Sequence, residues 1–318
     1  MRLNRVVVGM DFSKPAEDAA RWVARDFAPG AELVLVHVVA VPEPPRFFRG
    51  KFPPRETLVE TAREGADRRL RELSTTLGAE RIWLEIREGD PAEQIDSVAS
   101  EYDADVVVVG PHGARPGIWD RPGGTAEKIL RESRHTVLLA ANPREGDPLR
   151  VLVPLDESAA TPIVLDWAAR LASRPGAEVT LLHVVSSTML NELMTAGAVV
   201  SGVMMPVPDD VLTNAEMDSG SWLARLAADA GLDASGVKTE VKAGDPADQI
   251  LAAAQRLDAE LIVMGSSSRG IRAALLGSVA REVIRSAKRP VLVARGRLEE
   301  ASAETERAER REGDEQNS

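Results

Sequence analysis

Short runs of branched apolar residues alternate along the chain with longer stretches in which apolar residues recur at helical spacing. In the first half this pattern predicts strands near Arg5–Met10, Glu32–Val39, Arg81–Arg87, Val106–Gly110 and Thr136–Ala140. Helices are predicted near Pro15–Phe27, Glu56–Leu77, Pro91–Tyr102 and Gly124–Ser133. Continuously apolar strands separated by helices are typical of a parallel sheet that is covered on both faces. The pattern therefore predicts an α/β fold.

The whole pattern occurs twice in the same order. Segments 5–11, 31–39, 89–95 and 105–110 match segments 150–156, 177–185, 244–250 and 260–265. We therefore predict two domains, 1–141 and 150–295, joined by a linker at 142–149 that holds two prolines and a glycine. Each domain is predicted to be Rossmann-like and doubly wound, with a five-stranded parallel sheet in the flavodoxin-like strand order 3-2-1-4-5. The charged segment 296–318 is predicted to be a disordered tail.

Local signals support this division. Pro91 and Pro246 suit the first position of a helix, with Asp90 and Asp245 as the preceding N-caps. Each copy ends on an apolar fifth strand, which should be an edge of its sheet. Because an apolar edge invites strand addition, we predict that the two fifth strands pair with each other through a pseudo-two-fold axis.

Composition limits the function classes. The apolar fraction is 44% and there is no cysteine, which excludes disulfides, Cys-ligated zinc and thiol catalysis. The formal net charge of −11 argues against broad binding of nucleic acid or of anionic membranes. No apolar run approaches the ~20 residues that span a bilayer. The first ten residues lack the regions of a signal peptide, so a cytoplasmic location is expected.

A ligand site is predicted beyond the carboxyl ends of the first and fourth strands, where the winding direction reverses. Asp11 and Asp156 follow the first strand of each copy, and a glycine-containing loop follows the fourth. The loop of the first copy holds Gly110, Gly113, Gly123, Gly124 and Thr125, and the loop of the second holds Gly265, Ser268, Gly277 and Ser278. Such a loop, running into a helix N-terminus, presents backbone N–H groups to a phosphate.

With these motifs, both halves resemble the universal stress protein family, and the whole chain resembles its tandem form. The resemblance implies that Asp11 and Asp156 lie beside a nucleoside and that Val38 and Val184 lie against adenine. The glycines Gly110, Gly113, Gly123, Gly265 and Gly277 would surround the ribose and phosphates, and Ser278 would supply a hydroxyl. Gly124 replaces that hydroxyl in the first copy, although Thr125 follows, and Ser268 replaces the middle glycine in the second copy.

The resemblance implies a stress-response regulatory protein that binds ATP, with Mg²⁺ as an accompanying ion, in at least one half. The first copy is favoured because it keeps all three glycines at the family spacing. A nucleotide-free scaffold that binds protein partners is the alternative, and a slow ATPase is a weaker one. No catalytic or metal-ligating residue is assigned, and a homodimer is left open.

Several residues have a plainer interpretation beside the functional one. Asp11 and Asp156 could cap the following helix. His37 and His183 lie within apolar strands, which indicates structural, hydrogen-bonded histidines, whereas His112 lies in the phosphate loop and could touch phosphate. The inserts after the second strands, with Arg46–Phe52 in one copy and Met189, Met194, Met204 and Met205 in the other, could be flaps or binding surfaces.

Overall fold

A computed structural model describes residues 3–42, 53–113, 122–144, 146, 149–186, 209–232, 236–266 and 276–296. The first half contains β1 (Arg5–Gly9), α1 (Lys14–Trp22), β2 (Glu32–Val39), α2 (Arg55–Leu77), β3 (Ile82–Glu88), α3 (Pro91–Glu101), β4 (Val106–Val109), α4 (Gly124–Glu132) and β5 (Val137–Leu139). A π-helical turn over Val23–Phe27 continues α1. The predicted strands and helices of this half are confirmed, with ends that agree to within about one residue.

The second half repeats this order. It contains β6 (Arg150–Leu155), α5 (Thr161–Ala172), β7 (Glu178–Ser186), α7 (Asp209–Asp229), β8 (Lys238–Gly244), α8 (Pro246–Arg256), β9 (Leu261–Gly265), α9 (Ser278–Ser286) and β10 (Val291–Ala294). Residues 43–52 and 187–208, which make up most of the two inserts, lie outside the described residues. The tail beyond residue 296 lies outside them as well. The predictions for Arg46–Phe52, for the four methionines and for the tail therefore stay predictions.

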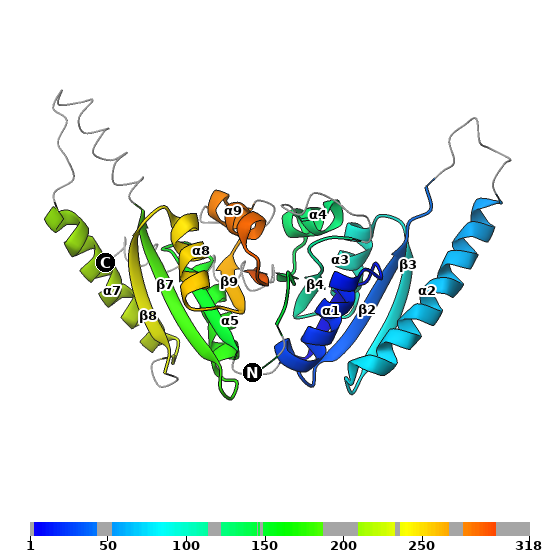
Figure 1. The fold of residues 1–318 in the computed structure, drawn as a ribbon, viewed down its shortest axis with the longest axis horizontal. Helices are drawn as coiled ribbons and strands as arrows, with labels where there is room; N and C mark the ends of the chain where they lie inside the picture. The colour runs from blue at the N-terminus through cyan, green and yellow to red at the C-terminus, as the bar shows by residue number, and fades with distance from the viewer. Residues whose placement is uncertain are drawn as a thin grey trace, which may run out of the picture.

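All ten strands form one continuous sheet in the order β3-β2-β1-β4-β5-β10-β9-β6-β7-β8. Each half thus has the predicted order, and the strands within a half run parallel. At the centre β5 and β10 pair antiparallel, with Leu138 opposite Leu292. These leucines are equivalent positions of the repeat, so the pseudo-two-fold axis passes between them. The predicted pairing of the fifth strands is confirmed, and Figure 1 shows the two halves spreading from this central pair.

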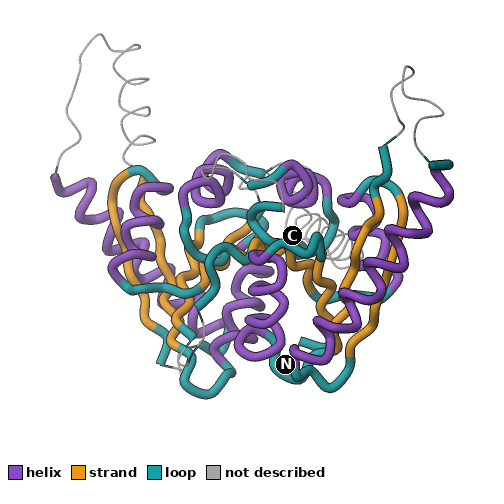
Figure 2. Tube along the Cα trace, turned by 45° about the vertical axis from the view of Figure 1, so that its right-hand side comes forward, coloured by secondary structure: helices purple, strands orange, loops and turns teal. Residues whose placement is uncertain are grey.

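Two apolar cores sandwich the sheet. One lies beneath α1, α2, α5 and α7, and the other lies beneath α3, α4, α8 and α9. Figure 2 shows the helices on both sides of the strands. Both cores cross the central seam, because Leu138 and Leu292 belong to the first core while Leu139 and Val291 belong to the second. The two halves therefore share their hydrophobic interior at the seam as well as their sheet.

The predicted helix starts have the expected capping bonds. Asp90 accepts hydrogen bonds from the backbone N–H groups of Ala92 and Glu93, at 3.0 and 3.1 Å. Asp245 does the same at the start of α8, with Pro246 at the first helical position. These bonds satisfy two of the N–H groups that every helix leaves open. Within the described ranges no helix is long and apolar enough to cross a membrane.

Candidate nucleotide site

A cavity of about 510 Å³ lies in the second half, at the carboxyl ends of β6, β7 and β9 and the start of α9. This is the crevice that the sequence predicts, where the winding direction of the sheet reverses. Asp156, Val184, Gly265, Gly277 and Ser278, which were all predicted site residues, line the cavity. Ser268 lies outside the described residues. The structure therefore brings together the predicted residues of this half that it describes.

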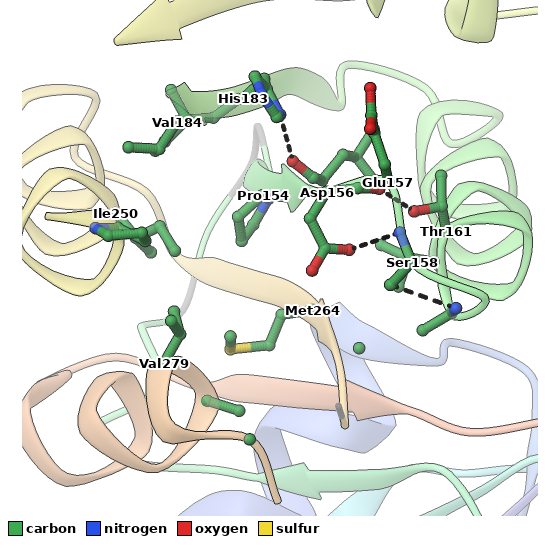
Figure 3. Close-up of a pocket in the computed structure, with 18 of the residues that line it drawn as sticks. Pro154, Asp156, Glu157, Ser158, Thr161, His183, Val184, Ile250, Met264 and Val279 are labelled. Atoms are coloured by element: carbon green, nitrogen blue, oxygen red, sulfur yellow. Dashed lines mark hydrogen bonds between the residues drawn. The ribbon is translucent and has the colours of Figure 1, made fainter. Parts of the chain in front are cut away.

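Asp156 is held in place by its own loop. One carboxylate oxygen accepts a hydrogen bond from the backbone N–H of Ser158 at 3.2 Å, and Thr161 donates its hydroxyl proton to the Asp156 carbonyl. The other carboxylate oxygen points into the cavity (Figure 3). An ionised carboxylate accepts hydrogen bonds and cannot donate them. The loop after β6 thus presents an acceptor suited to a hydroxyl-bearing ligand.

The wall opposite Asp156 is apolar. Val184 from β7, Ile250 from α8, Met264 from β9 and Val279 from α9 all line the cavity, and Figure 3 shows them on the side away from Ser158 and Thr161. Such a surface can contact the face of a flat ring. Sequence reasoning missed Ile250, Met264 and Val279. The repeat offered a signal for Ile250, because it ends the motif at 244–250 that recurs at 89–95.

The helices that follow the glycine loops begin differently from the aspartate-capped pair α3 and α8. α4 and α9 have glycine N-caps, Gly123 and Gly277, and neither cap makes a side-chain hydrogen bond. The backbone N–H of Gly123 donates to the Pro111 carbonyl at 2.8 Å, and that of Gly277 donates to the Ser266 carbonyl at 2.7 Å, so both bonds stay within the loops. α3 and α8, by contrast, are capped by aspartates. A helix start that lacks a side-chain acceptor favours an external anion.

Gly110 and Gly265 have a structural role of their own. A Cβ at Gly110 would lie 3.3 Å from the backbone nitrogen of Ala16, and a Cβ at Gly265 would lie 2.7 Å from the Cβ of Ala160. These glycines let the starts of α1 and α5 pack against the ends of β4 and β9. A Cβ at Gly113 would lie 2.8 Å from Oδ2 of Asp11, so that glycine permits the loop to approach the carboxylate.

The first half has the same frame. Asp11 accepts a hydrogen bond from the backbone N–H of Ser13 at 3.0 Å. The capping alternative for Asp11 is wrong, because Ser13 is the N-cap of α1 and accepts from Ala16. Asp156 likewise precedes the Ala160 N-cap of α5. Gly124 and Thr125 are exposed at the start of α4, while Val38 is partly buried on β2. Residues 114–121 of this loop lie outside the described residues.

The strand histidines make the same backbone bond in both halves. Nδ1 of His37 lies 2.7 Å from the Met10 carbonyl, and Nδ1 of His183 lies 2.9 Å from the Leu155 carbonyl. Each nitrogen must carry its proton to donate to a carbonyl. Burial lowers the pKa of His37 below its ordinary value, which favours the neutral ring. The prediction of hydrogen-bonded histidines is thus confirmed. His112 borders a different cavity, between the halves.

The fold and the crevice define a tandem pair of doubly wound α/β domains. The model of the family described as "Universal stress protein family" matches residues 2–140 and 149–295. The chain therefore belongs to the universal stress protein family, in its two-domain form. Universal stress protein Rv2623 of Mycobacterium tuberculosis is 28% identical over 316 residues, which cover 92% of this chain and 97% of that protein.

Two further proteins are similar to this chain over most of its length. A universal stress protein of Mycolicibacterium smegmatis is 28% identical over 306 residues and covers 92% of this chain and 97% of its own length. The crystal structure of a universal stress protein from Archaeoglobus fulgidus superposes with a TM-score of 0.59 at 20% identity, covering 92% of this chain and 97% of that one. The structural likeness at this identity supports the two-domain fold.

Proposed function

We propose that this protein is a stress-response regulatory protein that binds an adenine nucleotide in the crevice of its second half. The observation that carries the proposal is the cavity of about 510 Å³ that lies between the Asp156 carboxylate, an apolar wall and the start of α9. The spacing of the glycines in the sequence favoured the first half as the nucleotide site. The cavity formed by the described residues supports the second half instead.

Each part of the cavity matches one part of a nucleotide. The apolar wall of Val184, Ile250 and Met264 suits the face of a purine ring. The inward oxygen of Asp156 suits the ribose hydroxyls, because a carboxylate accepts their protons in strong, charge-assisted hydrogen bonds. The N–H groups at the start of α9, together with the Ser278 hydroxyl, suit phosphate oxygens. A ligand with these three parts in this order is a nucleoside phosphate, and Mg²⁺ would accompany ATP.

The first experiment asks whether the full chain holds or binds a nucleotide. We expect adenine nucleotide to be released when the purified protein is denatured, or ATP with Mg²⁺ to bind when titrated into nucleotide-free protein. If no nucleotide is released and none binds, the proposal is rejected. The alternative, a nucleotide-free scaffold built on the paired halves, would then be preferred, since the continuous sheet already joins the domains.

A matched pair of variants locates the site. Asp156→Asn keeps an oxygen for the Ser158 N–H but removes the charge, so we expect ATP affinity to fall by about 1–3 kcal/mol. Asp11→Asn makes the same change in the first half and should leave that affinity within a factor of about two. Isothermal titration measures the affinity, and thermal melts check folding. A loss confined to Asp11→Asn would move the site to the first half.

A further inference from the structure

The pseudo-two-fold symmetry is broken by one residue beside the central strands. Ala141 follows β5, and Arg295 stands at the same position after β10. Arg295 is only 7% exposed. Its backbone N–H donates to the Thr136 hydroxyl at 3.1 Å, and that hydroxyl lies 3.2 Å from the Arg295 carbonyl. The second half therefore extends a buried cation into the first half, whereas the first half has an alanine, Ala141, at the equivalent position.

The guanidinium of Arg295 is bound by the end of α4. Its two terminal nitrogens donate to the carbonyls of Leu130 and Ser133. These carbonyls belong to the last turn of the helix and the residue after it, where oxygens lack helical partners and the dipole favours a cation. Burial lowers the pKa of Arg295 to about 10, and nearby Asp96 acts in the opposite direction. The side chain thus stays charged at neutral pH.

The equivalent place on the other side of the axis is open. In the repeat, Ile284 and Ala287 at the end of α9 correspond to Leu130 and Ser133 at the end of α4. A cavity of about 680 Å³ is lined by Ala141, Ile284 and Ala287, the counterparts of Arg295 and of its two carbonyl partners. The cavity lies on the seam between the halves, where the end of α9 faces the start of α1 and the residues that follow β5. Alanine leaves unfilled the volume that arginine occupies across the axis.

We propose that this seam cavity, lined by Ala141, Ile284 and Ala287, binds the guanidinium group of an arginine-like ligand. The ligand would donate to the α9 carbonyls as Arg295 donates to those of α4. The cavity is separate from the crevice that holds Asp156, so the proposal does not rest on nucleotide binding. A planar guanidinium donates several N–H groups in a fixed fork, which suits two carbonyls at a helix end better than a single ammonium does.

Among the described residues, the wall of the cavity carries one acidic side chain, Asp18, and two basic ones, Arg285 and Lys288. Asp18 of α1 lines it and also pairs with Lys14 and Arg21. Arg285 and Lys288 lie in the wall as well, but Arg285 is paired with Glu282 and Lys288 is exposed. Their counterparts Arg131 and Arg134 flank the α4 end that accepts Arg295. Flanking cations therefore do not prevent a guanidinium from binding at such a helix end.

The test compares L-arginine, agmatine and L-citrulline on the full chain by titration calorimetry and thermal shift. Citrulline has the shape of arginine without the charge. We expect arginine and agmatine to bind and to raise the melting temperature, and citrulline to bind at least about tenfold more weakly. Ala141→Arg should fill the cavity and abolish binding. If no guanidinium compound binds either to the native chain or to a full-length variant whose tail arginines are replaced by glutamine, or if Ala141→Arg leaves binding unchanged, the proposal is overturned.

Two further variants keep the test decisive if Ala141→Arg does not fold. Ala141→Leu fills the cavity without a charge and should also block binding. Asp18→Asn leaves the volume unchanged and should weaken binding of arginine but not of citrulline. Binding that is unaffected by both variants would overturn the proposal.

The chain itself carries guanidinium groups that could occupy the cavity. Four arginines follow residue 296, namely Arg297, Arg307, Arg310 and Arg311. A full-length variant with glutamine at all four positions distinguishes the two sources. Free arginine that binds equally to this variant and to the native chain identifies a small-molecule ligand. Binding only to the glutamine variant identifies the chain's own arginine as the occupant, which supports the same guanidinium site.

Discussion

The two halves keep one hydrogen bond and cover it with different side chains. In each half the second-strand histidine bonds to a carbonyl at the end of the first strand. In the first half the ring of Phe12 lies 4.5 Å from that of His37, while in the second half Trp222 of α7 lies 5.0 Å from His183. The covering aromatic thus comes from a loop in one copy and from a helix in the other. The repeat therefore keeps the hydrogen bond between the histidine and the backbone carbonyl, whereas the aromatic residue that packs on the histidine differs between the halves.

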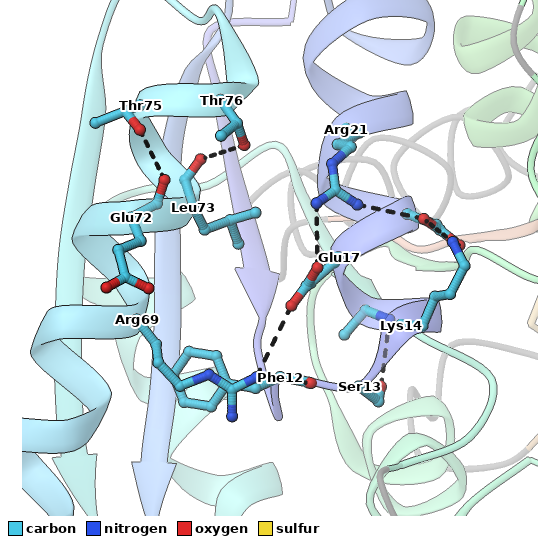
Figure 4. Close-up of polar contacts among 12 residues, drawn as sticks. Phe12, Ser13, Lys14, Glu17, Arg21, Arg69, Glu72, Leu73, Thr75 and Thr76 are labelled. Carbon is cyan, nitrogen blue, oxygen red and sulfur yellow. Dashed lines mark hydrogen bonds and ion pairs between the residues drawn. The ribbon is translucent and has the colours of Figure 1, made fainter.

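This exchange changes the loop that follows the first strand of each half. Phe12 has a φ of +60°. The guanidinium carbon of Arg69 lies 4.2 Å from the centre of the Phe12 ring, and the Arg69 guanidinium also donates to the Phe12 carbonyl at 3.2 Å. Glu17 pairs with both Arg69 and Arg21, as Figure 4 shows. These contacts tie the first loop to α2. Glu157 and Pro162 occupy the positions of Phe12 and Glu17 in the second half.

The floor of the crevice also differs between the halves. A Cβ at Gly9 would lie 2.9 Å from the Cδ1 atom of Ile95, so Ile95 closes over the first strand. The second half has Pro154 in place of Gly9, and both Pro154 and Ile250 line the open cavity. The two copies therefore share their strands and the aspartate caps of α3 and α8, while the residues at the carboxyl ends of the strands differ. Ligand binding is expected to follow that divergence.

The largest effect is expected where the symmetry is broken. Arg295→Ala leaves the carbonyls of Leu130 and Ser133 without their buried donor and opens a space at the seam. We expect the free energy of unfolding to fall by about 3 kcal/mol. Arg289→Ala is the matched control, because Arg289 pairs with Asp258 nearer the surface and should cost less than about 1 kcal/mol. Urea denaturation measures both, and equal losses would show that the buried contact adds nothing.

An intermediate effect is expected at the glycines after the fourth strands. Gly265→Ala would place a Cβ 2.7 Å from that of Ala160, whereas Gly110→Ala would meet the Ala16 nitrogen at 3.3 Å. We expect Gly265→Ala to cost about 1–3 kcal/mol and Gly110→Ala to cost less. Ala160→Gly should restore most of the stability of Gly265→Ala, because it removes the clashing atom and glycine is tolerated at an N-cap. No restoration would mean that the clash is not the cause.

Most of the fold followed from the sequence because its signals are local and occur twice. Apolar runs set the strands, Asp90 and Asp245 set helix starts, and the apolar fifth strands indicated the pairing of the halves. Asp156 could be placed at the crevice because it follows the first strand of its copy, while the place of Val184 came from the family resemblance. The capping alternative for Asp11 was wrong because Ser13, two residues later, provides the cap.

Other features depend on contacts between distant residues. Arg295 follows the last strand and directly precedes the charged segment 296–318, so nothing in its sequence neighbourhood indicates burial. It becomes buried only because the second half places it against α4 of the first. The cavity of the second half depends likewise on Pro154, Ile250 and Met264, which meet only in the fold. Glycine spacing alone could not reveal that geometry.

The smallest expected effect is a pH dependence that comes from the cover of His37. Burial holds the pKa of His37 below the ordinary value of 6.5, and the Met10 carbonyl and Asp11 oppose that shift. The unfolded chain therefore binds more protons than the folded chain just below pH 6.5, so stability should decrease as the pH falls from 6.5 through the folded pKa. Phe12→Ala admits water to the ring and should raise the pKa of His37 toward 6.5, which reduces this loss. NMR titration of His37 measures the pKa, and urea denaturation at pH 7.5 and 5.5 measures the loss of stability.

Carboxylates with lowered pKa values, such as Glu32 and Asp90, lose their stabilising charge only at more acidic pH, so they do not contribute to the change between pH 7.5 and 5.5. An unchanged pKa in Phe12→Ala would mean that the strands alone, and not the exchangeable aromatic, keep the ring from water.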